Sequence, residues 1–317
     1  MHILIHYPFT REQIDGFTEL AQSYGHTVAW AEDDETAIAA APEAEVILGH
    51  FRPEVCAVAP KLRWIQSFST GMDKFLFPEI VARDEVQISN VAGLYASQGG
   101  EHAWALLLAL TRQLPLAVHN KDARQWASDP VIEVAGMTLG VIGMGGFGIE
   151  MAKRAQGYDM TVIAIDPVRT EAPSYVHELR PATEENLHDL LRRSDIVMMA
   201  CPLTKETYHL ISTEELALMK PTAYLINVTR GGIIDEPALV QALKSGQIAG
   251  AGLDVVEKEP LDPNSPLWDA PNLIITPHRA GASQHRPRKI YEFFLQNLER
   301  YMKGERPLNV IDKQRGF

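Results

Sequence analysis

Cysteine is scarce in this chain, which holds only Cys56 and Cys201 among its 317 residues. The two cysteines form no Cys-x-x-Cys pair and lack the spacing of zinc ligands. A disulfide framework is therefore excluded, no metal site is expected, and the composition favours a reducing cytoplasm.

Long hydrophobic runs are also missing. The longest candidate, residues 103–110, is far shorter than the roughly 18 residues that a membrane-spanning helix needs. Residues 1–9 have the pattern of a short strand and lack the basic region, long apolar stretch and cleavage site of a signal peptide. We therefore expect neither a membrane span nor a secretory signal.

Positive charge is in short supply, because 29 Lys and Arg stand against 41 Asp and Glu, a net charge of −12. An acidic chain without Lys/Arg runs is a poor partner for nucleic acid or an anionic membrane. It also repels a small anionic substrate at long range. An acidic substrate would therefore need a local cation to receive it.

Short apolar runs alternate with helix-like segments, which is typical of an α/β fold with parallel sheets. The first third of the chain contains predicted strands at 3–7, 27–30, 46–49, 64–67 and 87–89. Predicted helices cover residues 100–114 and 288–302, and residues 119–130 form a polar stretch. A second series of predicted strands lies at 138–142, 161–165, 196–200, 223–227, 250–254 and 273–276.

Six such strands are what a doubly wound dinucleotide-binding sheet requires. We therefore predict a dinucleotide-binding domain over residues 99–288. Residues 1–98 and 289–317 together form the predicted substrate domain.

A glycine-rich turn follows the first strand of the second series. Gly143, Gly145 and Gly148 fit the pattern Gly-x-Gly-x-x-Gly, and the residues after them can continue as a helix. The three glycines allow a tight turn, a close approach of pyrophosphate, and close packing of helix on strand. A flexible turn is the alternative, but the position between strand and helix favours a dinucleotide site.

Asp166 ends the next strand, about 20 residues past the glycines, where an adenosine-ribose ligand belongs. Its carboxylate can accept from both ribose hydroxyls and would repel a 2′-phosphate. The sequence therefore predicts NAD, with NADP less favoured. Arg169 lies nearby, and its positive charge favours NADP instead.

Three later segments each follow a strand of the same predicted sheet, and they carry Arg230, Glu259 and His278. Because ligands of open α/β sheets bind at the carboxyl ends of strands, the three side chains can converge on one crevice. Each alone has an ordinary interpretation: a surface turn, a solvated carboxylate and a loop histidine.

With these segments the chain resembles the D-isomer-specific 2-hydroxyacid dehydrogenase family, in its glyoxylate/hydroxypyruvate reductase-like form. The matching motifs occur in order over nearly the whole chain: Ser69-Thr-Gly-Met-Asp73, Glu101-His102, the glycine turn, Cys201 to Thr207, Arg230-Gly-Gly232, Leu253 to Pro260, Asn264 to Trp268 and Thr276 to Ser283. The resemblance implies a doubly wound Rossmann domain inserted in a smaller flavodoxin-like α/β substrate domain. It also implies a homodimer formed partly by residues 101–126.

The resemblance implies a catalytic set of Arg230, Glu259 and His278. His278 acts as the acid/base paired with Glu259, and Arg230 binds and polarises a small 2-oxo or 2-hydroxy acid, while hydride moves between NAD(H) and C2. Implied cofactor contacts are Gly143, Gly145, Gly146, Phe147, Gly148, Asp166, Pro202, Thr204, Val228, Thr229 and Asp254. Implied substrate contacts are Thr70, Gly71, Arg230 and His278.

Two positions depart from the family pattern. Ser97-Gln-Gly-Gly100 replaces small and β-branched residues, and we expect Gln98 to add a polar contact and the glycines to add freedom between the domains. Arg279 follows the histidine where an apolar residue is commoner, either as a second substrate-facing cation or as an exposed arginine.

A non-catalytic, NAD-sensing dimeric protein of the same fold is the alternative function. The intact set of Arg230, Glu259 and His278 argues against it. A formate dehydrogenase is disfavoured because that relative pairs its histidine with an amide. The sequence leaves the side chain of the substrate and the physiological direction open.

Overall fold

The computed structural model describes residues 1–128 and 130–316, and within them the chain forms two compact units. Unit 1 combines Met1–Leu94 with the segment from Ser283 onward, and unit 2 is Tyr95–Ala282. The domain boundaries predicted from the sequence, after residues 98 and 288, lie a few residues farther along the chain. Which unit binds which ligand stays a prediction at this point.

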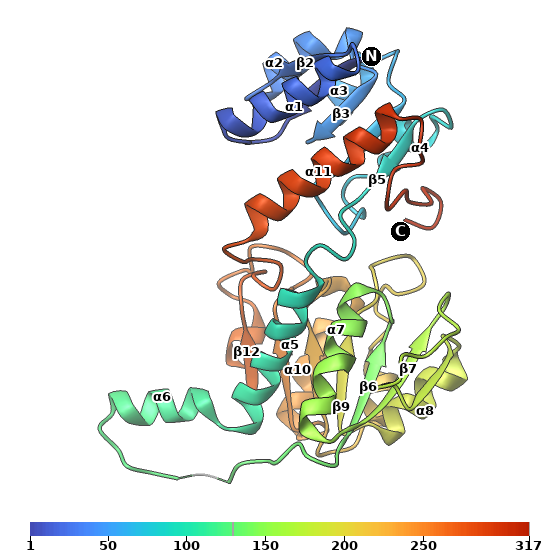
Figure 1. Ribbon diagram of the computed structural model, residues 1–317. Helices are drawn as coiled ribbons and strands as arrows, with labels where there is room; N and C mark the ends of the chain where they lie inside the picture. Colours follow the sequence, from blue (N-terminus) through green and yellow to red (C-terminus); the bar gives the residue numbers. More distant parts are fainter. Residues whose placement is uncertain (129, 317) are drawn as a thin grey trace. The chain divides into compact units, whose positions relative to one another are not determined.

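In the described part of unit 1, five parallel strands form a sheet in the order β2-β1-β3-β4-β5, the flavodoxin-like order (Figure 1). The strands are β1 (His2–His6), β2 (Thr27–Trp30), β3 (Val46–Gly49), β4 (Trp64–Gln66) and β5 (Gln87–Ser89). The helices are α1 (Arg11–Ser23), α2 (Asp34–Ala40), α3 (Pro53–Ala57), α4 (Pro78–Val81) and α11 (Arg286–Met302), with a 3₁₀ turn at Ala41–Glu43.

The C-terminal helix α11 is fixed to unit 1 by a buried polar pair and by aromatic packing. Asn297 is fully buried, and its Nδ2 donates to Gln66 Oε1 of β4 at 2.6 Å. Phe294 packs edge-on against Phe9, with ring centroids 5.7 Å apart. Unit 1 is therefore built from both ends of the chain.

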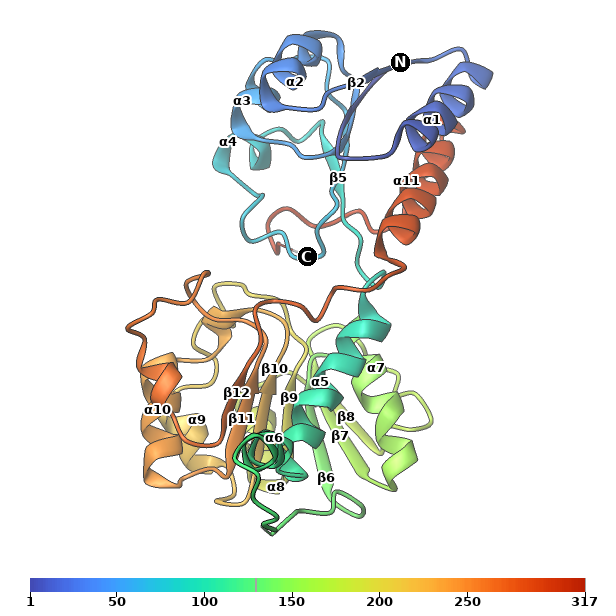
Figure 2. The same cartoon turned by 90° about the vertical axis from the view of Figure 1, so that its left-hand side faces the viewer.

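In the described part of unit 2, seven parallel strands form a sheet in the order β12-β11-β10-β9-β6-β7-β8 (Figure 2). The strands are β6 (Thr138–Ile142), β7 (Thr161–Asp166), β8 (Glu178–Pro181), β9 (Ile196–Met199), β10 (Tyr224–Asn227), β11 (Gly250–Leu253) and β12 (Leu273–Ile275). The helices are α5 (Ala96–Thr111), α6 (Leu114–Asp122), α7 (Gly146–Ala155), α8 (Glu184–Arg193), α9 (Thr213–Leu218) and α10 (Glu236–Ser245), with 3₁₀ turns at Gln156–Tyr158, Gly231–Ile233 and Pro266–Asp269.

Alternate residues of the unit 2 strands supply two hydrophobic cores, one on each face of the sheet. In β9, Val197 and Met199 pack with α8, α9 and α10, whereas Ile196 and Met198 pack with α5 and α7. This alternation follows from the two-residue period of a strand. The helices therefore cover both faces, which confirms the predicted doubly wound α/β fold.

The structure differs from the predicted elements in two places. The sequence did not predict β8, because this edge strand carries Glu178, Arg180 and Pro181 and is nowhere fully buried. The helix predicted at 100–114 spans Ala96–Thr111, and Pro115 lies in the first turn of the separate helix α6 instead of ending α5. Proline is tolerated in a first helical turn, where its missing N–H costs nothing.

We had expected Gly99 and Gly100 to add freedom between the domains. Instead, both lie inside helix α5. A Cβ at Gly99 would meet the Phe147 ring of α7 at 2.6 Å, and one at Gly100 would meet Glu150 Cβ at 2.9 Å. These glycines therefore allow α5 and α7 to lie side by side at close range, as both views show (Figures 1 and 2).

Candidate active site

At two positions of the turn between β6 and α7, steric crowding leaves no room for a side chain and requires glycine. Gly143 has a φ of 98°, and a Cβ there would meet the Cys201 backbone nitrogen at 2.8 Å. A Cβ at Gly148 would collide with the Gly143 carbonyl. Gly145 caps α7, and no atom lies within 4 Å of the Cβ position there. The absence of a side chain at Gly145 therefore leaves open space at the N-terminus of the ten-residue helix α7. Such a position suits a phosphate group.

Asp166 ends β7 beside this turn. Its Oδ2 accepts from the Met144 N–H at 2.7 Å, and its Oδ1 accepts from Val168 and Arg169 N–H at 2.8 and 2.6 Å. Arg169 Nε donates to the Met144 carbonyl at 2.9 Å. The acid and the arginine therefore both border the turn, as the predicted ribose site requires.

The segment after β9 carries Pro202 and Thr204 and lies next to the glycine turn through Cys201. Thr207 closes this segment: its hydroxyl donates to the Pro202 carbonyl at 2.6 Å and accepts from Thr204 N–H at 2.8 Å. Pro202 is exposed and Thr204 is partly exposed. Thr207 is the residue that shapes them, and sequence reasoning gave it no role.

Asn227, at the end of β10, organises the residues that follow it. Its Oδ1 accepts from the backbone N–H and the hydroxyl of Thr229, both at 3.0 Å, and its Nδ2 donates to the Arg230 carbonyl at 2.8 Å. The side chain is fully buried. Asn227 was not among the predicted site residues, although an amide at the end of an apolar strand was a usable signal.

Arg230 begins the turn Gly231–Ile233 and is partly exposed. Its Nη1 donates to the Thr229 carbonyl at 2.9 Å. A Cβ at Gly231 would collide with the Val256 carbonyl group, so only glycine lets this turn touch the segment that leads to Glu259. The segments that follow β10 and β11 are therefore in direct contact.

His278 and Glu259 form a pair. The imidazole Nδ1 lies 3.0 Å from Oε1 and 2.9 Å from Oε2 of the carboxylate. Because a carboxylate only accepts hydrogen bonds, Nδ1 carries the hydrogen and Nε2 is left to face a ligand. The His278 side chain is 46% exposed. Arg230, Glu259 and His278 follow the adjacent strands β10, β11 and β12.

Asp254, at the end of β11, is almost completely buried. Its Oδ1 accepts from the Thr276 hydroxyl at 2.6 Å and from Arg279 N–H at 2.8 Å, and its Oδ2 accepts from Ala280 N–H at 2.7 Å. Burial raises the pKa of this carboxyl, but hydrogen bonds from His102, Thr276 and these two amides outweigh burial and lower the pKa below its ordinary value. The carboxylate thus holds the loop that contains His278.

Thr70 and Gly71 belong to unit 1, in the segment that follows β4. Their carbonyls are engaged: Asn90 Nδ2 donates to Thr70 at 2.9 Å, and the Ser69 hydroxyl donates to Gly71 at 2.8 Å. The predicted substrate loop is therefore shaped by Ser69 and Asn90, which the sequence analysis did not single out for a role.

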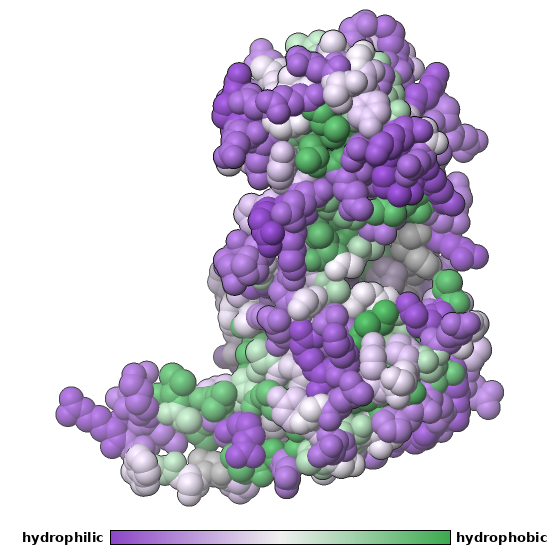
Figure 3. All heavy atoms as spheres, in the orientation of Figure 1, coloured by the Kyte–Doolittle hydropathy of each residue, from purple (hydrophilic) through white to green (hydrophobic). Residues whose placement is uncertain are grey.

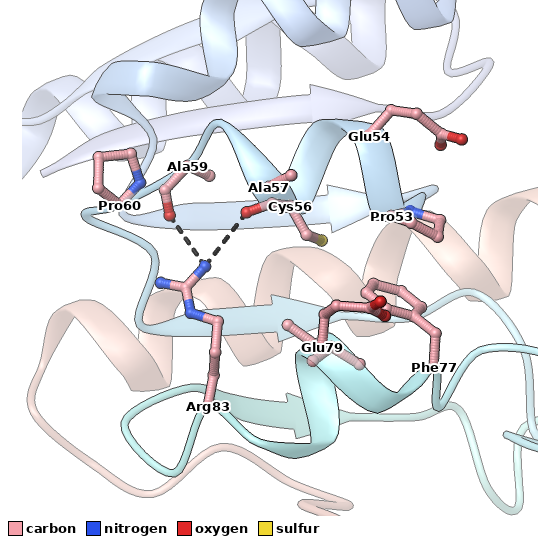
Figure 4. Close-up of a pocket in the computed structure, with 10 residues that line it drawn as sticks. Pro53, Glu54, Cys56, Ala57, Ala59, Pro60, Phe77, Glu79 and Arg83 are labelled. Atoms are coloured by element: carbon pink, nitrogen blue, oxygen red, sulfur yellow. Dashed lines mark hydrogen bonds between the residues drawn. The ribbon is translucent and has the colours of Figure 1, made fainter.

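A cavity with a volume of about 600 Å³ lies elsewhere in unit 1, between α3 and α4 (Figure 4). Arg83 borders it, but its Nη1 donates to the Cys56 and Ala59 carbonyls at 3.2 and 3.0 Å. Apolar side chains and helix backbone make up much of the rest. This cavity offers no acid/base pair, so we place the candidate site at the carboxyl edge of the unit 2 sheet.

Two features are absent from the described residues. No helix among them is long and apolar enough to cross a membrane. They also contain no group of three or more His, Cys, Asp or Glu arranged to hold a metal ion.

A Rossmann sheet with a glycine turn and a histidine–carboxylate pair at one edge defines a dinucleotide-dependent oxidoreductase. The family model described as "D-isomer specific 2-hydroxyacid dehydrogenase, NAD binding domain" matches residues 104–280, more than half of the chain. The chain therefore belongs to the D-isomer-specific 2-hydroxyacid dehydrogenase family and is an oxidoreductase.

Known proteins agree with this assignment. A glyoxylate reductase of Korarchaeum cryptofilum is 38% identical over 267 residues, 82% of this chain and 79% of that protein. A family member from Aeromonas salmonicida has a crystal structure with a TM-score of 0.83 at 29% identity, covering 98% of this chain and 99% of that one. A probable 2-hydroxyacid dehydrogenase of Rhizobium etli, solved in complex with NADP, has a TM-score of 0.83 at 26% identity and covers 99% of each chain.

Proposed function

We propose that this enzyme reduces small 2-oxo acids, and in reverse oxidises small 2-hydroxy acids, with Arg230, Glu259 and His278 as its catalytic residues. The observation that carries the proposal is the Glu259–His278 pair, whose Nδ1–carboxylate contact leaves Nε2 for the reacting oxygen. Family membership alone supports the class of reaction, and the proposal adds the roles of these three residues.

A nicotinamide bound by the residues of unit 2 would supply the hydride chemistry at C2 of the oxo or hydroxy acid. His278 Nε2 gives a proton to the carbonyl oxygen during reduction and takes it back during oxidation. The Glu259 carboxylate stabilises the imidazolium form and fixes the ring. The Arg230 guanidinium binds the substrate carboxylate and polarises the carbonyl, and so provides the local cation that an acidic chain needs.

The residues of unit 2 fit a dinucleotide. Open backbone at Gly145, the N-terminus of α7 and the turn-bordering carboxylate of Asp166 suit a pyrophosphate and a ribose. We assign the cofactor contacts to Gly143, Gly145, Gly146, Phe147, Gly148, Asp166, Pro202, Thr204, Val228, Thr229 and Asp254. We assign the substrate carboxylate to Arg230, and substrate contacts of the Thr70 and Gly71 backbone in unit 1 stay a prediction from the sequence.

NAD is the proposed cofactor in preference to NADP, because the Asp166 carboxylate repels a 2′-phosphate. Arg169 opposes this preference, since it lies on the same turn with Nε bonded to the Met144 carbonyl. The related structure from Rhizobium etli contains NADP, which also counts against the preference for NAD. Comparing kcat/KM for NADH and NADPH tests the assignment, and a higher value for NADPH would contradict it.

Glyoxylate and similarly small 2-oxo acids are the proposed substrates, because the Korarchaeum relative is named a glyoxylate reductase. The test measures NADH consumption with glyoxylate, hydroxypyruvate, pyruvate and bulkier 2-oxo acids. His278→Ala should abolish turnover and leave NADH binding intact. An NAD-sensing protein without turnover would instead bind NADH and consume none with any of these acids.

A homodimer is proposed from the exposed apolar residues of α6 and the segment after it. Leu114 and Val118 are exposed on α6, and Trp126 is fully exposed. Figure 3 shows hydrophobic side chains on the side of this helix that is in view. Sedimentation at the mass of a single chain would contradict the dimer.

The cytoplasmic location expected from the sequence stays a prediction.

A further inference from the structure

Helix α5 lies close to the end of β11 because β11 contains a glycine. A Cβ at Gly252 would meet Leu106 Cβ of α5 at 2.9 Å. His102 precedes Leu106 by one helical turn and so lies on the same face of the helix. The glycine therefore brings His102 within reach of the polar residues that follow β11 and β12.

Three consecutive backbone amides in the loop after β12 donate to Asp254. His278 N–H donates to the Asp254 carbonyl at 2.7 Å, Arg279 N–H to Oδ1 at 2.8 Å, and Ala280 N–H to Oδ2 at 2.7 Å. His278 has a φ of 51°, in the left-handed region that residues other than glycine seldom adopt. Such a conformation persists only when surrounding contacts hold it. The three hydrogen bonds to Asp254 contribute to holding it here.

His102 completes this arrangement from α5. Its Nε2 lies 2.8 Å from the Thr276 hydroxyl oxygen and 3.2 Å from Asp254 Oδ1. The Thr276 hydroxyl has one hydrogen, which it donates to Asp254 at 2.6 Å. Its oxygen must therefore accept from His102, so Nε2 carries a hydrogen. That N–H also faces a carboxylate whose side chain is fully buried and needs compensation.

A second residue of α5 contacts the same loop. Gln98, one turn before His102, is buried, and its Nε2 donates to the Gly281 carbonyl at 3.4 Å. The sequence predicted a polar contact for Gln98, and the contact in the structure is with the backbone of Gly281. Helix α5 therefore touches the loop both before and after His278.

We propose that His102 is a positioning residue for the acid/base histidine: with Thr276 and Asp254 it forms a clamp that holds the backbone of residues 278–280. The inference rests on the proposed role of His278. Small misplacements of a reacting group lower the rate strongly, because the proton must travel along a short, aligned path. The clamp thus acts on kcat through His278 without touching substrate.

The test compares His102→Leu with His102→Gln. Leucine keeps an apolar side chain on α5 but removes the N–H donor, whereas the glutamine amide can place an N–H near the position of Nε2. We expect His102→Leu to lower kcat by about tenfold to a hundredfold with little change in KM for NADH. His102→Gln should recover most of the loss. Rates are expressed per NADH-binding site, so partly unfolded protein does not count.

Glu101→Gln is the matched control, since Glu101 is the neighbouring residue, is 67% exposed and pairs with Arg154. Its kcat should equal that of the wild type. If His102→Leu does not fold, Thr276→Val against Thr276→Ser makes the same comparison, because only serine keeps the hydroxyl. A His102→Leu variant with wild-type kcat overturns the clamp.

Amide hydrogen exchange separates the clamp from the proposed function. The peptide that covers residues 276–282 should exchange faster in His102→Leu than in Glu101→Gln. If the wild type reduces no 2-oxo acid, the proposed function fails, and this exchange measurement still decides the clamp. Equal exchange in the two variants overturns it whatever the activity.

Discussion

Both oxygens of the Glu259 carboxylate face Nδ1 of His278, at 3.0 and 2.9 Å. The contact fixes which imidazole nitrogen carries a hydrogen and which one meets a ligand. It joins the segment after β11 to the loop after β12, two neighbouring strands of one sheet. The catalytic proposal depends on this relationship.

Glu259→Gln should lower kcat on the order of tenfold to a hundredfold, because a neutral amide holds the ring but does not stabilise an imidazolium. The measurement is the pH profile of kcat for reduction of glyoxylate, whose acid and base limbs report the groups that carry the proton. Glu257→Gln is the control, since Glu257 bonds His209 at 2.6 Å and not His278. Equal kcat values for wild type and Glu259→Gln would remove the carboxylate from the mechanism.

Arg230→Lys should raise KM for the oxo acid by about tenfold or more, because lysine keeps the charge and loses the planar fork that binds a carboxylate with two hydrogen bonds. The dissociation constant of NADH should stay near the wild-type value. Arg192→Lys is the control for general effects of the substitution, because Arg192 is exposed in the last turn of α8. An unchanged KM would show that the substrate carboxylate binds elsewhere.

Acid should destabilise the fold partly through Asp254. Its pKa is lowered in the folded state, so it contributes stability above its unfolded pKa of about 3.9, and this contribution is lost as pH falls through the lower folded value. Denaturant unfolding at several pH values should show a shallower acid decline for Asp254→Asn than for the wild type. Parallel declines would contradict the lowered pKa.

Both thiols should be inert in the native protein. Burial is the largest cause that raises the pKa of Cys56 and of Cys201, each to about 12. Because only the thiolate reacts, about one molecule in 10⁴ carries it at pH 8. A thiol reagent should modify neither cysteine until denaturant unfolds the chain, and then both. Rapid labelling of native protein would contradict this burial.

Most of the fold could be predicted from the sequence, because buried parallel strands are continuous apolar runs with Gly, Pro or polar residues at their ends. The interior strands β3 and β6 occur at the predicted residues. The edge strand β8 has no such run, since an edge is half solvated. Helix α6 was obscured by Pro115, which the sequence alone could not distinguish from a helix end.

The sequence by itself determined the chemistry that is present: the spacing of the glycine turn and the order of Arg230, Glu259 and His278 after successive strands. Only the tertiary structure decided which polar groups meet. Asn227, His102 and Asp254 hold the turns that carry the site, and their partners include residues as far as 174 positions away in the chain. Local sequence encodes strands and turns because these depend on neighbouring residues, whereas a contact between α5 and the end of β12 depends on how the sheet and helix pack.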